Sequence, residues 1–329
     1  MVSSTRLSGD VTVPRFLLAG LTCSCLIVIG AIAAVTWSME TDGAVKSHIF
    51  FSLQVPLMIT AMLTGAVLTV SAGTLQVVLR NPLADPGIIG ITSGASLVAA
   101  VLILTAPAFA QSYFHYLLPL GCFIGAIAST VLIYRLARRL QQASMAVILA
   151  GIAVSTLSGA VIAWLYLFTD AQSMRNLTFW LMGSLYQADG TLLWVAAPIM
   201  LLSCAYQLVQ AKKLNWLYAG DNAAAVAGVS PQQLIRRVLL AASIGVGAAV
   251  SVAGSIAFLG LLVPHVLRLF VGYDNRVILP ASALTGALFL LLVALATEML
   301  GTVTFPVSMI TATLGGPLLL WAIYKGQWR

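Results

Sequence analysis

Long apolar runs separated by short polar segments dominate the pattern of this chain. Most runs are close to the length of about 20 residues that an α-helix needs to cross a bilayer. Because backbone polar groups in lipid must pair within their own segment, each run predicts a helix. The pattern therefore predicts an all-α, polytopic membrane protein with about ten transmembrane helices in a single domain, residues 1–329. The runs cover about residues 14–38, 49–79, 87–107, 114–134, 144–168, 191–210, 234–256, 257–271, 278–300 and 306–324.

Two of these runs do not have the length of one simple span. Residues 49–79 are too many for one perpendicular crossing, and we expect Pro56 to separate a short outer helix from the span itself. Residues 257–271 are few and contain Pro264, which predicts a broken or partial crossing buried among its neighbours.

Three connections are longer than simple turns. Residues 80–87 form a cytoplasmic segment interrupted by two prolines and a glycine. Residues 169–190 contain an amphipathic stretch, Ser173–Leu185, which predicts a helix on the outer surface. The longest cytoplasmic loop covers about residues 211–232, and its alanine-rich part, Asp221–Ala227, has helical character.

Composition removes several alternatives. Hydrophobic residues make up 60% of the chain and charged residues only 8%, with a mean hydropathy of +1.03. A soluble domain carries about 25% charged residues, so a soluble enzyme, a disordered chain and a coiled coil are excluded. The net charge of +7 could suggest nucleic acid. We expect no nucleic-acid partner, because the sequence shows no basic face with aromatic stacking residues.

The positions of the basic residues predict how the chain is oriented in the bilayer. If the N-terminus is inside, all 16 lysines and arginines except Lys46 and Arg175 fall on the cytoplasmic side. Because cytoplasmic loops of membrane proteins are enriched in lysine and arginine, this distribution predicts that both termini are cytoplasmic.

Motifs of membrane-embedded enzymes are absent from the sequence. It contains no Gly-x-x-x-x-Gly-Lys-Ser/Thr loop and no zinc-type histidine motif. We therefore expect no catalytic residue, no metal site and no cofactor in this chain. Glu298 lies near the outer end of its span, and no acid falls near a span centre. An ion-coupled secondary transporter usually has acids or histidines near mid-bilayer, so it remains only the alternative, and a partner is the expected source of energy.

Four stretches agree in order and spacing with one family. Residues 80–96 read RNPLADPGIIGITSGAS, residues 254–268 read GSIAFLGLLVPHVLR, residues 279–287 read LPASALTGA, and residues 311–321 read TATLGGPLLLW. From about residue 50 to its C-terminus, the chain resembles the FecCD-type permeases. These are the membrane subunits of bacterial ABC importers for ferric siderophores, haem and cobalamin.

The resemblance implies a permease subunit of a binding-protein-dependent ABC importer in the bacterial inner membrane. Its partners would be a second permease subunit, identical or paralogous, a dimer of ATP-binding subunits and a periplasmic substrate-binding protein. ATP and Mg²⁺ would be used by the ATP-binding partner, so this chain would not itself be an enzyme. The expected cargo is an iron chelate, with ferric siderophore as the first candidate and haem or cobalamin as the next.

Part of the first stretch is a turn that the resemblance identifies as a family signature. Pro82 and Pro86 prevent a continuous helix there, and Asp85 lies just before the next span, where the helix dipole favours a negative charge. The turn either helps to position the permease over its ATPase or is a plain turn with a capped helix. Its residues are Arg80, Asn81, Pro82, Asp85, Pro86 and Gly87.

The loop at 211–232 resembles the coupling region of the family, two short helices that fit a cleft in the ATPase. This chain departs from the family pattern with Ala219 and Ala227, where leucine is usual. A solvated linker is the alternative, but apolar groups such as Trp216 and Val226 favour a docking surface. The matching residues are Leu217, Gly220, Asp221, Ala224 and Gly228.

On the outer face the resemblance leads us to expect two arginines around positions 54 and 57, and a further basic residue near the last outer loop. This chain has Gln54, Leu57 and Glu298 at or near these places, which are the candidate positions for docking of the binding protein. Either the binding protein docks with different charges, or a non-identical second permease subunit supplies the arginines.

Small and polar residues interrupt the apolar run at 144–168. Ser155, Thr156, Ser158 and Gly159 make this segment the candidate wall of the transport pathway. The alternative is that these small residues pack one helix against another.

Overall fold

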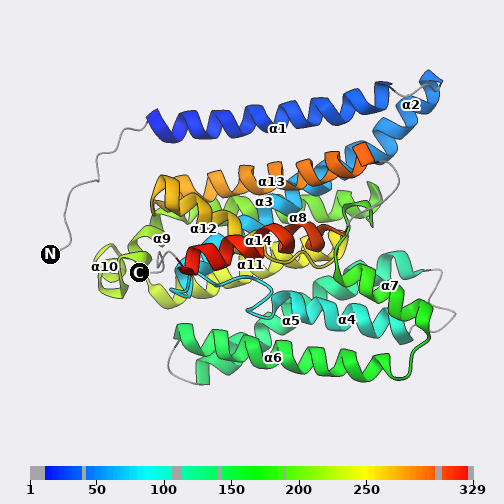
Figure 1. Ribbon diagram of the computed structural model, residues 1–329. Coiled ribbons are helices and arrows are strands. Elements are labelled where there is room, and N and C mark those ends of the chain that lie inside the picture. The colour runs from blue at the N-terminus through cyan, green and yellow to red at the C-terminus, as the bar shows by residue number, and fades with distance from the viewer. Residues whose placement is uncertain are drawn as a thin grey trace.

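The computed structural model describes residues 12–38, 42–105, 113–139, 143–187, 190–300 and 306–324, and these residues form helices joined by short connections with no strand among them (Figure 1). In chain order the elements are α1 (Thr12–Ser38), α2 (Gly43–Ile49), the π-helical turn η1 (Phe50–Gln54), α3 (Val55–Val78), α4 (Ile91–Thr105), α5 (Phe114–Arg139), α6 (Ala143–Tyr166), α7 (Ala171–Leu181), the 3₁₀ turn η3 (Leu185–Gln187), α8 (Gly190–Val209), α9 (Ala211–Tyr218), α10 (Asp221–Val226), α11 (Pro231–Ala253), α12 (Leu259–Val271), α13 (Asn275–Leu300) and α14 (Val307–Tyr324).

Every apolar run of the sequence coincides with a helix, which confirms the predicted all-α polytopic fold. Within the described residues, seven helices are long and apolar enough to cross a membrane, and α4 and α12 are apolar but shorter. Ten complete crossings stay a prediction. Cytoplasmic termini also stay a prediction, because residues 1–11 and 325–329 lie outside the described residues.

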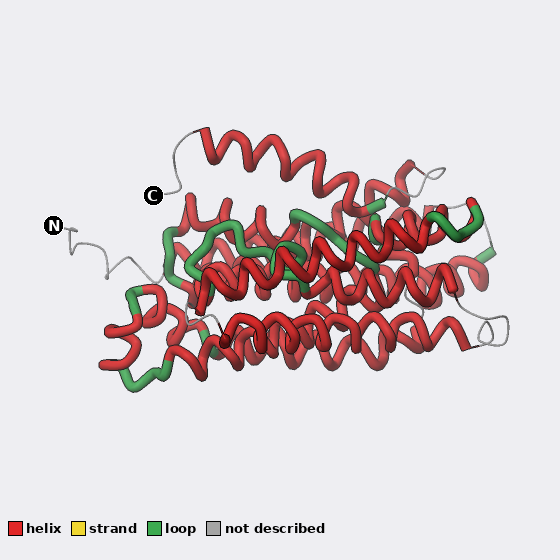
Figure 2. Tube along the Cα trace, turned by 90° about the horizontal axis from the view of Figure 1, so that it is seen from below, coloured by secondary structure: helices red, strands yellow, loops and turns green. Residues whose placement is uncertain are grey.

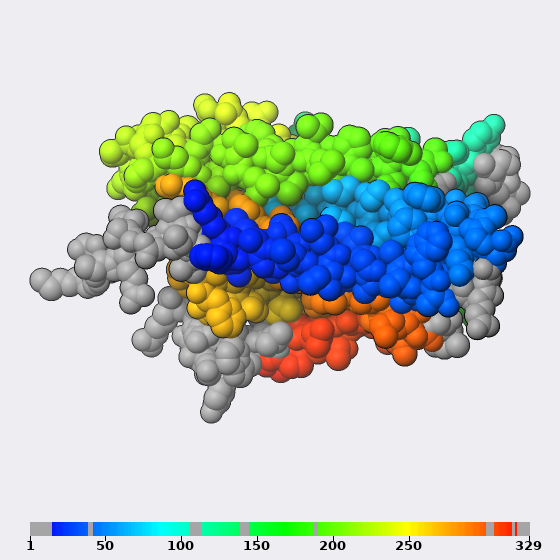
Figure 3. Space-filling model, turned by 90° about the horizontal axis from the view of Figure 1, so that it is seen from above, coloured from blue at the N-terminus to red at the C-terminus, as the bar shows by residue number. Residues whose placement is uncertain are grey.

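The helices are stacked in layers with α3 and α11 at the centre. Two thirds of the most apolar window of each of these helices is buried, against 17% in α1 and 28% in α6. α13 and α8 pack on α3, while α4 and α5 form the next layer and α6 covers them. α1 packs on α13 and lies along the surface of the molecule (Figure 3). The centre is therefore protein-lined, and the outer helices present apolar side chains to their surroundings.

α4 and α12 are short because irregular segments precede them. The chain enters α4 through residues 79–90 and α12 through residues 254–258, and Figure 2 shows loop segments that run lengthwise between the helices. Such backbone is tolerated within a membrane protein only where it is buried in protein or lines a cavity. The short run with Pro264 forms the 13-residue helix α12, and its role as a partial crossing stays a prediction.

The long run at 49–79 is divided, but not in the way that we expected. α2 is separated from α3 by the π-helical turn η1, and Pro56 lies in the first turn of α3. A proline is well tolerated there, because the first N–H groups of a helix have no partner within it. The π turn, rather than the proline, therefore divides the helical run.

The helical axes define two ends of the molecule. We call the end that carries α9, α10 and the turn 272–274 the basic end, and the end that carries α2 and α7 the opposite end (Figure 1). The predicted amphipathic helix is present as α7, whose N-terminus is capped by Asp170, and its location on the outer side of the membrane stays a prediction. Backbone hydrogen bonds from Ser173 and Gln172 lower the pKa of the Asp170 carboxyl.

Candidate functional site

Two short helices at the basic end, α9 and α10, form the region predicted to couple to a partner. α9 is amphipathic: Leu214 and Leu217 are buried against the bundle, while Trp216 is 43% exposed. In α10, Ala224 is fully buried, whereas Val226 is 92% exposed. Each helix therefore packs one face against the bundle and exposes apolar groups on the other, as a docking surface does.

The side chain of Asn215 fastens α9 to the turn between α12 and α13. Its Nδ2 donates to Oδ1 of Asp274 at 2.6 Å. Its Oδ1 accepts from the backbone N–H of Asn275 at 2.9 Å and from Nδ2 of the same residue at 2.8 Å. Since Asn275 is buried, these bonds satisfy polar groups that would be costly to leave unpaired.

An aromatic contact reinforces this attachment. The rings of Tyr218 at the end of α9 and Tyr273 in the turn are stacked, with centroids 5.6 Å apart and an interplanar angle of 17°. Burial, together with the neighbouring Tyr273, raises the pKa of Tyr218. Tyr218 is thus neutral at physiological pH, and the two rings act through packing.

α10 is fastened to a different part of the chain, the signature turn. Nη2 of Arg80 lies 2.6 Å from Oδ1 of Asp221, the first residue of α10. The side chains are 48% and 59% exposed, so this ion pair contributes about 0–1 kcal/mol to stability. Two residues from separate predicted motifs therefore meet in space, and their contact is weak enough to open and close.

Within the signature turn, Asp85 reaches a partner that the sequence did not indicate. Its Oδ2 accepts from the backbone N–H of Gly87 at 2.9 Å. The carboxylate also accepts from the backbone N–H of Leu261, in the first turn of α12. Asp85 thus stabilises the N-terminus of α12, where a negative charge is favourable, besides its own turn. Burial raises the pKa of Asp85 to about 6.

The rest of the turn is shaped by local bonds. Oδ1 of Asn81 accepts from the N–H of Leu83 at 2.9 Å. Pro82 and Pro86 lie outside any helix, as predicted. The small residues after the turn allow close packing: a Cβ added to Gly94 would lie 2.4 Å from the carbonyl oxygen of Gly125 in α5.

These contacts connect the α9–α10 pair to both ends of α12. Arg80 begins the segment whose Asp85 holds the N-terminus of α12, and Asp221 of α10 pairs with Arg80. Asn215 and Tyr218 of α9 hold the turn that follows the C-terminus of α12. A displacement of α9 and α10 would therefore be transmitted to a short helix whose N-terminus lies inside the bundle.

The candidate pathway residues of α6 do not share one face. Oγ of Ser155 accepts from Oγ of Ser93 in α4 at 2.8 Å, and Ser158 is buried. Thr156 and Gly159 are exposed, and a Cβ added to Gly159 would meet nothing within 4 Å. Within this chain, Ser155 contacts α4 and Ser158 is buried, while the other two residues face outward. The pathway role stays a prediction for all four residues.

The three candidate docking positions at the opposite end differ in exposure. Gln54 and Leu57 are 2% and 3% exposed, and the side-chain oxygen of Gln54 accepts a hydrogen bond from Thr36 of α1. Neither residue offers its side chain to a binding protein in this conformation, and the docking role of these two positions stays a prediction. Glu298 is partly exposed and accepts from the hydroxyl of Tyr186 at 3.4 Å. The docking role of Glu298 stays a prediction.

A cavity at the opposite end was not foreseen from the sequence. It has a volume of about 720 Å³ and lies among the ends of α4, α5, α7 and α8. Its polar lining includes His115, Asp170, Ser173 and Asn176. The sequence feature that could have indicated this cavity is the polar face of the amphipathic segment, which we interpreted only as a solvent-facing surface.

The chain is similar in sequence to known transport proteins. The sequence profile of the FecCD transport family matches residues 11–325. The hemin transport system permease protein HmuU of Yersinia pestis is 39% identical over 88% of this chain and 86% of its own length. The vitamin B12 import system permease protein BtuC of Vibrio cholerae is 34% identical over 95% of this chain and 94% of its own.

A solved structure has the same fold. It is an inward-facing conformation of a metal-chelate type ABC transporter, with a TM-score of 0.84 and 28% sequence identity. The match covers 94% of this chain and 99% of that one.

Proposed function

Because this chain belongs to the FecCD transport family, the membrane permeases of ABC importers, we propose that it moves a metal chelate inward across the bacterial inner membrane. Energy would come from a separate dimer of ATP-binding subunits, which uses ATP and Mg²⁺, while this chain would not hydrolyse ATP itself. A periplasmic binding protein would deliver the cargo, and a second permease subunit would complete the pathway.

Haem is the cargo that we propose first, ahead of cobalamin and ferric siderophore. This order differs from the sequence-based expectation, which placed ferric siderophore first. Support comes from the relatives: the hemin permease is 39% identical to this chain and the vitamin B12 permease 34%. All three cargoes are large chelates, so a pathway that must release them should lack strong ligands for the metal.

The proposed orientation places the basic end in the cytoplasm, because lysine and arginine are enriched there. In the described residues, the opposite end carries only Lys46 and Arg175 as basic groups, in α2 and α7. The ATP-binding subunits would then meet α9 and α10, and the binding protein would meet the opposite end, near Glu298.

The observation that carries this proposal is the double role of the α9–α10 pair. It exposes Val226 and Trp216 outward, while Arg80–Asp221 and Asn215–Asp274 attach it to segments at both ends of α12. ATP binding in the partner would favour one position of the pair, and the attached segments would follow. A ligand changes such an equilibrium only by its different affinity for the two states.

Val226→Asp tests this docking. Because Val226 is 92% exposed, the substitution should leave folding intact, while placing a carboxylate in an apolar contact. We expect the ATP-binding subunit to be lost during co-purification and uptake into proteoliposomes to fall more than tenfold. Val45→Asp is the matched control, since Val45 is an exposed valine of α2 at the opposite end. Normal co-purification of the Val226→Asp variant would contradict the proposal.

A second experiment identifies both the energy source and the cargo. Proteoliposomes are prepared with the ATP-binding subunits and with the cognate binding protein loaded with haem, cobalamin or a ferric siderophore. We expect vanadate to abolish uptake and haem to be taken up fastest. Uptake that persists without the ATP-binding subunit would instead support the alternative, an ion-coupled secondary transporter.

A further inference from the structure

A basic groove lies between α5 and α11 at the basic end, away from the α9–α10 contacts described above. Its outer part has a volume of about 490 Å³ and is lined by side chains of α5, α6 and α11. A second cavity of about 230 Å³ continues it. The two share Tyr134, Arg138 and Arg236, so they form one groove with two compartments.

The groove collects positive charge without a compensating acid. Arg138 and Arg236 line both compartments, Arg135 lines the second, and neither compartment is lined by an aspartate or glutamate. The two ion pairs found among the described residues use other arginines, Arg80 and Arg276. Two or three guanidinium groups that face one cavity without a counter-charge favour an anion there.

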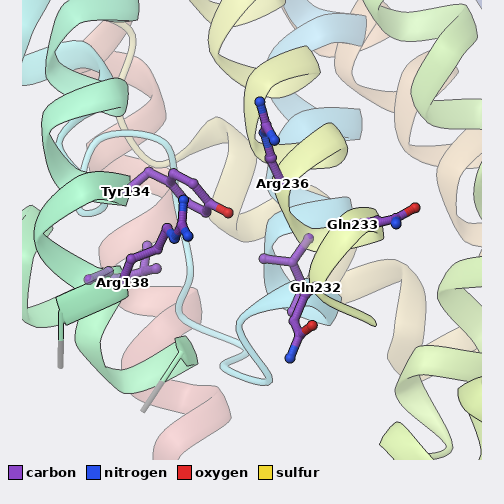
Figure 4. A pocket seen from close by; sticks show the side chains of 8 residues that line it. Tyr134, Arg138, Gln232, Gln233 and Arg236 are labelled. Carbon is purple, nitrogen blue, oxygen red and sulfur yellow. The ribbon is translucent and has the colours of Figure 1, made fainter. Parts of the chain in front are cut away.

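Hydrogen-bond donors complete the outer compartment. Figure 4 shows Tyr134 and Arg138 reaching from α5 into the space that faces Gln232 and Arg236 on α11. α11 also begins here, with no acidic residue in its first turn and no side-chain cap from Ser230. The unpaired N–H groups of that turn add positive potential to the compartment.

The second compartment combines arginines with apolar side chains. It is lined by Val131 of α5 and by Leu239 and Leu240 of α11, besides the arginines. Thr130 and Arg138 are eight positions apart on α5, so the lining extends about 12 Å along the helix axis. Arginines beside a run of apolar side chains in one groove match a phosphate headgroup followed by an acyl chain.

We infer that this groove binds an anionic phospholipid, with the phosphate between Arg138 and Arg236 and an acyl chain along Val131 and Leu240. Basic pockets between transmembrane helices on the cytoplasmic side are suited to such headgroups. A soluble phosphate would leave the apolar side chains of the second compartment without a partner. The lipid would link α5 to α11 by bridging one arginine from each helix.

The test measures lipid binding to the purified complex of the permease with its ATP-binding subunits. Native mass spectrometry is recorded during titration with dioleoylphosphatidylglycerol or with dioleoylphosphatidylcholine. We expect preferential binding of phosphatidylglycerol, weakened about fivefold by either Arg138→Gln or Arg236→Gln and about 30-fold by both. The variants Arg138→Lys and Arg236→Lys should retain most of the binding, because they keep the charge.

Arg237→Gln is the matched control, since Arg237 is an exposed neighbour on α11 that lines neither compartment. An equal loss in this control would overturn the proposal, because general surface charge would then explain the binding. Unchanged binding in the single Arg138→Gln and Arg236→Gln variants would overturn it as well. Glycerol 1-phosphate serves as a soluble competitor, and displacement of the lipid at equal concentration would assign the site to a free phosphate. Loss of the ATP-binding subunits with lipid binding intact would assign the arginines to a protein contact.

Discussion

The two ends of the molecule are held together by different kinds of bond. At the basic end, the connections between distant segments are made by side chains, as in Arg80–Asp221 and Asn215–Asp274. At the opposite end, besides side-chain contacts such as Tyr186–Glu298, three backbone hydrogen bonds join residues 182–184, 253 and 307–308. Ser184 N–H donates to the Ala253 carbonyl at 2.9 Å, and the N–H groups of Val307 and Ser308 donate to the carbonyls of Gly183 and Met182 at 3.1 and 3.0 Å.

The additional backbone hydrogen bonds at the opposite end indicate which end can move. An exposed side-chain contact contributes about 0–1 kcal/mol and can re-form with water or another partner. A backbone N–H or carbonyl that loses its partner away from water costs about 1–3 kcal/mol. The opposite end therefore acts as a fixed frame, and the basic end is built to shift when a partner moves α9 and α10.

The largest effect is expected from a disruption of the fixed frame. Gly183 has φ +71°, and a Cβ added there would lie 2.8 Å from the carbonyl oxygen of Ser255. Gly183→Val combines a strained backbone with a clash, and should lower the free energy of unfolding by about 3 kcal/mol or more. Thermal unfolding in detergent measures the loss. Gly190→Val is the control, because a Cβ there meets nothing within 4 Å, and equal stability of the two variants would refute the rigid frame.

A smaller, pH-dependent effect is expected at the basic end. In the wild-type protein, Nδ2 of Asn215 donates to Asp274 at 2.6 Å. Asn215→Asp keeps the oxygen that accepts from Asn275, but replaces this donor with a second carboxylate facing Asp274. Repulsion between the carboxylates raises the pKa of one of them, so the contact re-forms only when a proton is taken up. ATP-driven uptake should fall as the pH rises and recover as it falls. An uptake profile parallel to wild type across pH would show that the contact does not carry the motion.

The smallest change in stability is expected for the exposed ion pair. Arg80→Glu or Asp221→Lys should lower the free energy of unfolding by less than about 1 kcal/mol, but should reduce the number of cargo molecules taken up per ATP. The double variant restores opposite charges and should recover part of this ratio. If each single variant keeps the wild-type ratio, α10 does not act through the signature turn.

Features that depend on local pattern could be predicted from the sequence. The apolar runs identified the helices because a segment in lipid must satisfy its own backbone. Pro264 marked the short helix α12, and the amphipathic residues after Asp170 marked α7. The coupling helices were expected from a family resemblance, and their bounds, Ala211–Tyr218 and Asp221–Val226, lie within the predicted loop.

Features that depend on distant contacts could not be predicted. The pairing of Asp85 with Leu261 joins residues 176 positions apart, and a backbone N–H has no sequence signature. Asn215 was not singled out, because one asparagine in a short amphipathic helix looks like a solvated residue until the turn beside it is known. Gln54 was interpreted as a surface position. The π-helical turn that contains it, Phe50–Gln54, leaves no trace in the hydrophobic pattern, so its burial could not be predicted.

The contact between Asp85 and α12 also constrains how the protein is made. At a synthesis rate of about 5–20 residues per second, Leu261 is made roughly 10 to 35 s after Asp85. During that interval the carboxylate lacks the N–H groups of α12, and the segment that enters α4 has no complete surroundings. The nascent chain must therefore insert its first spans around an unfinished interior. The permease completes that interior only late in its own biosynthesis.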